Sequence, residues 1–189
     1  MKNTQPQLSL RRSAPGDELE LGRLWHTVFG DSKAFIDTFF RTLYAPGLAC
    51  LAFSGDRLAC AGYCLPGVAA LGKTCAYIYA VATYPEYRGM GAAAMVVRDL
   101  TQHAFDSGVD IVATLPASDS LTGWYEKVLN MTPVFKKGRP GAVFPDSWRR
   151  FADYCGSADS GAPKYLWAVG APGVDLAPFK ETGWQLTFE

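Results

Sequence analysis

The sequence lacks a surplus of charge of either sign, because eighteen Lys and Arg residues balance eighteen Asp and Glu residues. A protein whose surface attracts nucleic acid or an anionic membrane generally carries an excess of basic residues. The sequence also lacks a secretory signal peptide and an apolar run long enough to span a bilayer. We therefore expect a cytoplasmic protein whose partners include neither nucleic acid nor membrane.

The cysteines lack the spacing of a metal site. The five residues are Cys50, Cys60, Cys64, Cys75 and Cys155. Their number is odd, and four of them lie in apolar, strand-like runs where cysteine usually behaves as a small buried hydrophobic residue. We expect five reduced thiols, as in a cytosolic protein, and no bound metal ion.

No internal repeat and no shift in composition marks a domain boundary. Hydrophobic residues make up 49% of the chain and charged residues 19%, which is enough apolar content for a full core. The length of 189 residues fits one domain. We expect residues 1–189 to form a single domain, in which residues from about 138 to 189 are a C-terminal extension that completes the sheet.

Apolar periodicity predicts a mixed α/β fold of the α+β type. The expected strands cover residues 8–11, 48–53, 58–65, 74–83, 109–115, 134–135, 164–169 and 184–188, and helices lie at residues 17–29, 32–45, 92–107, 120–129 and 146–154. The strand–helix–strand unit from residue 74 to residue 115 should join two parallel strands.

Several residues are of the types that commonly cap helices. Asp17 with Glu20 has the spacing of a capping box, and Ser32 precedes the second helix as a cap. Ser118 or Ser120 should cap the helix that ends near residue 129. Asn130 suits the left-handed conformation that follows a helix.

The stretch from residue 76 to residue 95 joins a buried strand to a helix through a turn that contains glycine. Pro85 ends the strand, because proline cannot donate to a ladder. Gly89 and Gly91 then precede the helix, whose free amides and dipole favour a negative charge. The layout predicts a phosphate-binding loop.

A dinucleotide fingerprint also fits this loop, because Gly89, Gly91 and Ala94 match G-x-G-x-x-A. That fold needs an acidic residue near the end of the next strand, whereas Asp110 opens it. Too little chain remains afterwards to complete a doubly wound sheet. We therefore set the dinucleotide interpretation aside.

The segment from Thr83 to Ala93 resembles the acetyl-CoA loop of the GCN5-related N-acetyltransferases, the GNAT family. Arg88, Gly91 and Ala93 fill the fixed places of its R/Q-x-x-G-x-G/A pattern, and Thr83 stands where the family usually has valine. The resemblance implies a mostly antiparallel central sheet flanked by helices, with a splayed pair of parallel strands at the acetyl-CoA site. It also implies that acetyl-CoA is the co-substrate.

The resemblance assigns residues to acetyl-CoA binding from the end of the strand onward. They are Val81, Thr83, Arg88, Gly89, Met90, Gly91, Ala92, Ala93 and, further along the chain, Ser118. Ser118 replaces the asparagine that is usual in the family, so its contact with CoA would be shorter or lost.

Residues 118–127 resemble the N-x-x-A-x-x-x-Y-E-K helix of the family, which places Tyr125 on the tyrosine that protonates the CoA thiolate. A phenol with a pKa of about 10 carries its proton at neutral pH and can donate it. A shift of one residue in the alignment would place Glu126 there instead, and both assignments stay open. The sequence identifies no general base, and His26 is interpreted as a structural residue.

The resemblance implies direct transfer of an acetyl group to a primary amine of a small molecule or peptide, in a ternary complex. Two alternatives remain, namely an acyl-CoA-binding regulatory module without turnover and a non-enzymatic interaction protein. A homodimer also remains open.

Overall fold

The computed structural model describes residues 7–156 and 163–188. Its elements are β1 (Leu8–Arg12), α1 (Glu18–Phe29), α2 (Lys33–Thr42), β2 (Ala49–Ser54), β3 (Arg57–Ala70), β4 (Lys73–Thr83), η1 (Pro85–Tyr87), α3 (Ala92–Asp106), β5 (Ile111–Thr114), η2 (Asp119–Leu121), α4 (Thr122–Leu129), β6 (Thr132–Lys137), α5 (Asp146–Cys155), β7 (Tyr165–Gly170), η3 (Ala177–Glu181) and β8 (Gly183–Trp184), where η marks a short 3-10 helix. The predicted strands and helices are all present, several with shifted ends.

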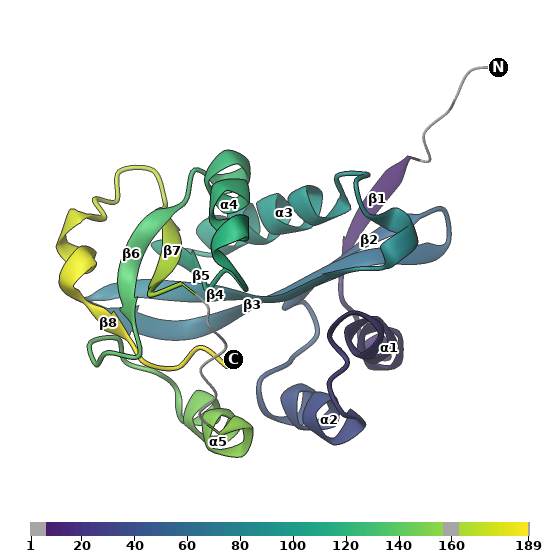
Figure 1. The fold of residues 1–189 in the computed structure, drawn as a ribbon, viewed down its shortest axis with the longest axis horizontal. Helices are drawn as coiled ribbons and strands as arrows, with labels where there is room; N and C mark the ends of the chain where they lie inside the picture. Colours follow the sequence, from purple (N-terminus) through teal and green to yellow (C-terminus); the bar gives the residue numbers. More distant parts are fainter. Residues whose placement is uncertain (1–6, 157–162, 189) are drawn as a thin grey trace. The chain divides into compact units, whose positions relative to one another are not determined.

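Within the described residues the strands form one eight-stranded sheet in the order β1-β2-β3-β4-β5-β7-β6-β8 (Figure 1). β1 and β2, β2 and β3, β5 and β7, and β6 and β7 pair antiparallel. β4 and β5 pair in parallel, as do β6 and β8. The sheet therefore confirms the predicted mixed fold with its parallel β4–β5 pair.

The chain divides into two compact units. Unit 1 comprises residues 1–63 and 80–100, and unit 2 comprises residues 64–79 and 101–189. Three elements, β3, β4 and α3, contribute residues to both units.

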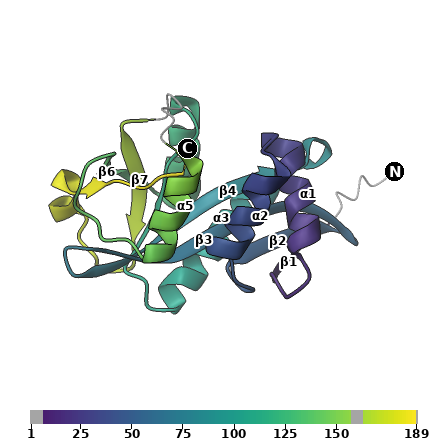
Figure 2. The ribbon, with the colours of Figure 1, turned by 90° about the horizontal axis from the view of Figure 1, so that it is seen from below.

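Unit 1 has an aromatic core beneath its two N-terminal helices. Trp25 from α1 lies 4.7 Å from Phe39 of α2 and 5.4 Å from Tyr63 of β3, measured between ring centroids. All three side chains are buried. Figure 2 shows α1 and α2 side by side, and their helical apolar periodicity explains why one face of each enters this core.

The first residues of α3 pack closely on β3 in the same unit. A Cβ atom added to Gly62 would lie 3.1 Å from Val81 and 3.2 Å from Val96. Glycine at this position therefore lets the helix approach the strand, and a larger residue would force them apart.

Unit 2 has a second aromatic core, to which α5 and β8 contribute. Trp148 of α5 and Trp184 of β8 each lie 5.8 Å from the ring of Tyr77 in β4, and Phe188 lies 4.9 Å from Trp148. Trp148 and Trp184 are fully buried. Aromatic pairs at these distances stabilise a core beyond their buried area, and they hold the C-terminal segment against β4.

Two of the predicted helix ends are confirmed. The Ser32 hydroxyl accepts a hydrogen bond of 3.2 Å from the amide of Phe35. Asn130 ends α4 with a left-handed φ of 55°.

The predicted capping box at Asp17 is wrong, although α1 does begin there. The Asp17 carboxylate makes no capping bond to the helix; it accepts hydrogen bonds from Arg11 and from the amide of Ala14 instead. A charged partner outcompetes the helix amides, because hydrogen bonds between ionised groups are stronger than those to a neutral amide.

The predicted serine caps of α4 are also wrong. The hydroxyl groups of Ser118 and Ser120 lie 2.7 Å apart and bond to each other. Leu121, the last residue of the short helix η2, occupies the N-cap position of α4.

Candidate functional site

The turn between β4 and α3 has the geometry of an anion-binding loop. β4 ends at Thr83, η1 follows, and Gly89 and Gly91 adopt left-handed φ values of 79° and 83° before α3 begins at Ala92. Such φ values favour glycine over any residue with a side chain. A Cβ atom at either position would meet nothing within 4 Å, so the backbone conformation, not crowding, requires glycine here.

A run of unpaired amides makes this loop distinctive. Among the described residues, the amides of residues 89–94 have no hydrogen-bond acceptor, and the first bond of α3 runs from Met95 to the carbonyl of Gly91. Free amides at the start of a helix point toward the space beyond it and favour a negative charge there. The loop therefore offers consecutive donors to an anion such as a phosphate.

The amide of Arg88 has a hydrogen-bond partner, unlike the amides that follow it. Its amide donates to the carbonyl of Pro85 at 3.3 Å, so the run of free amides begins one residue later. Its Nε donates to the carbonyl of Thr83 at 3.4 Å. Arg88 thus braces the turn against the end of β4, while its side chain stays exposed.

The remaining residues that were assigned to acetyl-CoA in unit 1 differ in exposure. Ala92 is buried, whereas Val81, Thr83, Met90 and Ala93 are partly exposed. The hydroxyl of Thr83 donates a hydrogen bond of 3.2 Å to the sulfur of Cys60, so this group is already engaged within the sheet.

In unit 2, Tyr125 and Glu126 lie in opposite environments. Tyr125 is 7% exposed on α4, whereas Glu126 is exposed to solvent. Burial raises the pKa of Tyr125 above its ordinary value, and a hydrogen bond with the Thr114 side chain opposes that rise. Tyr125 is therefore a protonated phenol at neutral pH.

The two tyrosines of β4 are tied to the C-terminal segment. The Tyr77 hydroxyl donates to the carbonyl of Thr187 at 3.0 Å, and the Tyr79 hydroxyl donates to the carbonyl of Phe188 at 3.1 Å. Their rings stack with centroids 5.9 Å apart. Side chains two residues apart lie on the same face of a strand, but no pattern in the sequence signals the distant partners of these two.

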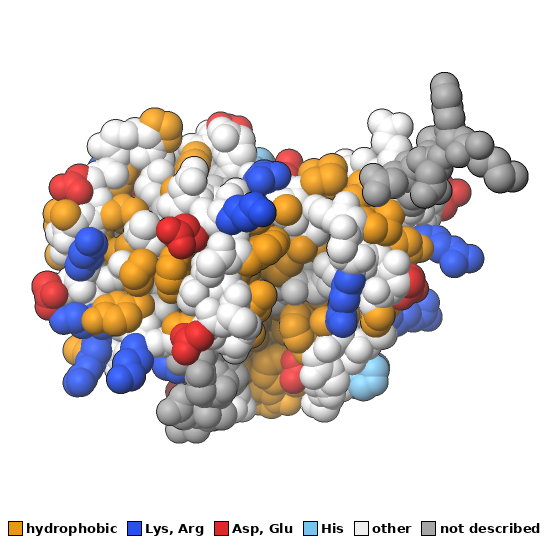
Figure 3. Space-filling model, turned by 45° about the horizontal axis from the view of Figure 1, so that its top comes forward, with side chains coloured by type: hydrophobic (Ala, Val, Ile, Leu, Met, Phe, Trp, Pro, Cys, Tyr) orange, Lys and Arg blue, Asp and Glu red, His pale blue; other side chains and the backbone are white. Residues whose placement is uncertain are grey.

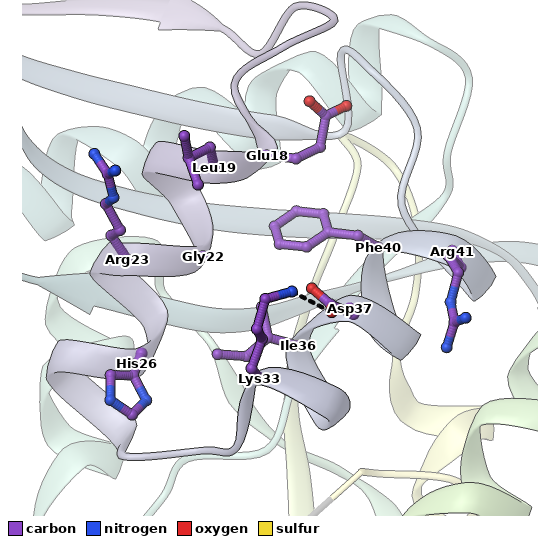
Figure 4. Close-up of a pocket in the computed structure, with 10 residues that line it drawn as sticks. All are labelled: Glu18, Leu19, Gly22, Arg23, His26, Lys33, Ile36, Asp37, Phe40 and Arg41. Atoms are coloured by element: carbon purple, nitrogen blue, oxygen red, sulfur yellow. Dashed lines mark hydrogen bonds and ion pairs between the residues drawn. The ribbon is translucent and has the colours of Figure 1, made fainter.

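A pocket of about 680 Å³ lies between α1 and α2 in unit 1 (Figure 4). Its apolar lining comes from Leu19 and Gly22 of α1 and from Ile36 and Phe40 of α2, and Lys33 pairs with Asp37 at 2.5 Å along its side. None of the residues assigned to acetyl-CoA lines this pocket.

His26 also lines this pocket, and its contacts agree with a structural role. Its Nδ1 lies 2.8 Å from the carbonyl oxygen of Asp31, so Nδ1 must be the donor. The Asp31 carboxylate accepts a bond of 2.7 Å from the indole of Trp25. His26 and Trp25 together hold the turn between α1 and α2.

The described residues contain no group of three or more His, Cys, Asp or Glu side chains that could hold a metal ion. None of the five cysteines is paired with another. Burial raises the pKa of Cys60 to about 11 and that of Cys75 to about 12, so neither is a thiolate near neutral pH.

In the part of the chain that is described, no helix is long and apolar enough to cross a membrane. On the face in Figure 3, Lys and Arg side chains are interspersed with Asp and Glu side chains. Neither sign of charge covers this face, in keeping with the balanced composition.

Comparison with known structures finds the same fold in N-acetyltransferases. The GNAT family N-acetyltransferase YhbS of Escherichia coli, solved with CoA, is 15% identical with a TM-score of 0.61, over 89% of this chain and 83% of that one. A GNAT acetyltransferase of Brucella melitensis, solved with acetyl-CoA, is 15% identical with a TM-score of 0.55, over 68% of this chain and 84% of that one.

Other similar structures are much longer than this chain. A GCN5-related N-acetyltransferase of Anabaena variabilis is 21% identical with a TM-score of 0.57, over 70% of this chain and 33% of that one. Four such relatives are covered over 32% to 47% of their own length. No curated protein matches the sequence.

The family model of the acetyltransferase (GNAT) domain matches residues 9–128, which contain the loop before α3 and Tyr125. This match covers more than half of the sequence and agrees with the observed sheet order and the parallel β4–β5 pair. The chain belongs to the GNAT acetyltransferase family.

Proposed function

We propose that this protein binds acetyl-CoA and transfers the acetyl group directly to a primary amine of a small molecule or peptide. The observation that carries the proposal is the run of free amides at residues 89–94, which includes Gly89 and Gly91 with their left-handed φ values. The pyrophosphate of CoA is an anion that such a loop accommodates. The complexes of the Escherichia coli and Brucella melitensis relatives with CoA and acetyl-CoA support this choice of substrate.

The proposed reaction needs few groups from the protein. The amine attacks the thioester carbonyl, the bond from carbon to sulfur breaks, and the sulfur leaves as a thiolate that takes up a proton. Tyr125 is our candidate donor, because its hydroxyl is protonated at neutral pH. The attacking amine loses its own proton to solvent in this scheme, and we assign no side chain as general base.

Burial supports Tyr125 over Glu126 as the acid. Glu126 is exposed to solvent, whereas Tyr125 is 7% exposed. A buried phenol keeps its proton and can give it to a thiolate. The alternative with Glu126 would place the acid on a side chain that faces solvent.

The proposal is tested by measuring thiol release from acetyl-CoA in the presence of amines, peptides and aminoglycosides. Release that depends on one class of amine, with the acetylated product identified by mass spectrometry, is the expected result. Binding of acetyl-CoA in calorimetry without thiol release from any acceptor would favour a regulatory module without turnover. Absence of both binding and release would contradict the proposal.

A further inference from the structure

Gly22 lies in the interior of α1, where glycine lowers the stability of a helix relative to alanine. The backbone does not require glycine here, because the φ of Gly22 is not left-handed. Crowding does not require it either, since a Cβ atom at Gly22 would lie 3.4 Å from Ile36 and 3.7 Å from Phe40, which is ordinary van der Waals contact. Neither local conformation nor packing therefore accounts for this glycine.

The absence of a side chain at Gly22 leaves the pocket between α1 and α2 open. Ile36 and Phe40 line it from α2, opposite Gly22 (Figure 4). Leu19 of α1 adds an apolar side chain that is 67% exposed. The volume of about 680 Å³ falls within the range of roughly 300–1,000 Å³ that is usual for small-molecule sites. A bound apolar group would cover Leu19 and fill the space above Gly22.

The charged side chains of the pocket favour an anionic ligand. Three are basic and two are acidic, namely Arg23, Lys33, Arg41, Glu18 and Asp37. Asp37 is already paired with Lys33 at 2.5 Å, and the carboxylate of Glu18 accepts a bond of 2.8 Å from a backbone amide. Among the described residues, neither Arg23 nor Arg41 pairs with a carboxylate. The guanidinium group of arginine matches a carboxylate in charge and in shape.

We propose that this pocket binds a small amphipathic carboxylate. Its apolar body lies over Gly22 against Leu19, Ile36 and Phe40, and its carboxylate is held by the arginines at the rim. The inference goes beyond the proposed function and does not depend on it, because none of the residues assigned to acetyl-CoA lines the pocket.

Three probes with the same apolar chain test the preference for an anion. They are octanoate, the neutral octanamide and the cationic octylamine, each titrated into ¹⁵N-labelled wild-type protein and followed by NMR. Octanoate should shift the amide signals of α1 and α2. Octanamide and octylamine should bind roughly 10- to 100-fold more weakly, because they lose the hydrogen bonds between ionised groups. Equal affinities for the three probes, or octanoate shifts confined to other elements, would overturn the proposal.

Gly22→Leu tests the place of the apolar body, because its side chain would fill the pocket. A folded Gly22→Leu variant should bind octanoate at least roughly 10-fold more weakly than the wild type. Gly123→Leu is the matched control, since Gly123 is a glycine of α4 with open space around it and lies outside the pocket. This control should keep the wild-type affinity. Unchanged affinity in Gly22→Leu would contradict the proposed site.

The place of the carboxylate is tested by a double variant, Arg23→Gln with Arg41→Gln. Its affinity for octanoate should fall to that of the wild type for octanamide, whereas its affinity for octanamide should stay the same. An octanoate affinity equal to that of the wild type would show that the arginines do not hold the carboxylate.

The stability of Gly22→Ala provides a measurement without any ligand. Alanine should raise the Tm by roughly 2–4 °C, because it is the better residue in a helix interior and has room here. A lower Tm in Gly22→Ala would mean that packing requires the glycine, and the argument for an open binding pocket would fail.

Discussion

The guanidinium group of Arg11 donates two hydrogen bonds to the carboxylate of Asp17, with Nη1 2.7 Å and Nη2 2.8 Å from the two carboxylate oxygens. The amide of Ala14 adds a third bond to the same carboxylate. This bidentate pair ties β1 to the start of α1. It replaces the capping box that the spacing of Asp17 and Glu20 predicts.

The pair should make stability depend on pH. The hydrogen bond with Arg11 lowers the pKa of Asp17 below its ordinary value of 3.8. A lowered pKa in the folded state stabilises the protein above the unfolded pKa, and this contribution is lost as the pH falls through the folded value. Asp17→Asn should therefore lower the free energy of unfolding at pH 7 and have progressively less effect below about pH 4. Urea unfolding at several pH values measures this.

Asp37→Asn provides the control for that series. Asp37 pairs with Lys33 on the exposed side of α2, where both partners are hydrated. Pairs of this kind contribute little, so a smaller change at pH 7 is expected. An equal loss in the two variants would mean that the bidentate geometry of Arg11 and Asp17 has no special effect.

Gly91→Glu should abolish acetyl-CoA binding, because it places an anion next to the amides that we propose as the site of the pyrophosphate. Glutamate at a φ of 83° is also strained, so the variant should lose some stability. Calorimetry with acetyl-CoA, together with thermal unfolding, measures the two effects separately.

Gly47→Glu is the control for backbone strain, because Gly47 has a similar φ of 92° and equally open space around it. This control should lose comparable stability and keep its affinity for acetyl-CoA. A folded Gly91→Glu variant with unchanged affinity would remove the basis of the proposed phosphate site.

Tyr125→Phe should lower turnover by roughly 10²–10⁴-fold, the usual contribution of a positioned general acid. Binding of acetyl-CoA should change little, because our proposal assigns the pyrophosphate contacts to the loop at residues 89–94 and not to Tyr125. The pKa of Tyr125 is raised above that of an ordinary tyrosine. Wild-type turnover should therefore show no loss from deprotonation of Tyr125 until the pH rises above that ordinary pKa. Steady-state rates across pH measure both expectations.

Glu126→Gln is the matched variant for that experiment. It should be nearly as active as the wild type, because the carboxylate of Glu126 faces solvent. A slow Glu126→Gln with a normal Tyr125→Phe would reverse the assignment, and normal rates in both would leave the proton transfer to water.

Thiol titration should find five free thiols per chain under denaturing, non-reducing conditions, because the structure pairs none of the cysteines. In the folded protein, Cys50, Cys60 and Cys75 should react much more slowly, because burial raises the pKa of each thiol and excludes the reagent. A count of one or three in the denatured protein would mean that disulfides form.

Local patterns in the sequence predicted much of the fold. The strand that ends at Thr83, the cap at Ser32 and the left-handed Asn130 each follow from residues that are neighbours in the chain. The loop at residues 89–94 belongs to this class too, because a strand, two glycines and a helix specify its backbone. The single-domain organisation and the assignment of residues to acetyl-CoA stay predictions.

Contacts between distant segments could not be read from the sequence. Arg11 of β1 binds the carboxylate of Asp17 and so prevents the expected capping box. No local pattern in the sequence reveals that β1 and the start of α1 lie together. The bonds of Tyr77 and Tyr79 to Thr187 and Phe188 have no sequence signal either, because their acceptors are main-chain carbonyls that every residue possesses.

The hydrogen bonds of Tyr77 and Tyr79 cannot form during synthesis until the C-terminal residues have been made. Tyr77 and its acceptor Thr187 are separated by 110 positions in the chain. At a synthesis rate of about 5–20 residues per second, roughly 6 to 22 s pass between the appearance of the two residues at the ribosome. Throughout this interval the aromatic face of β4 has no C-terminal partner.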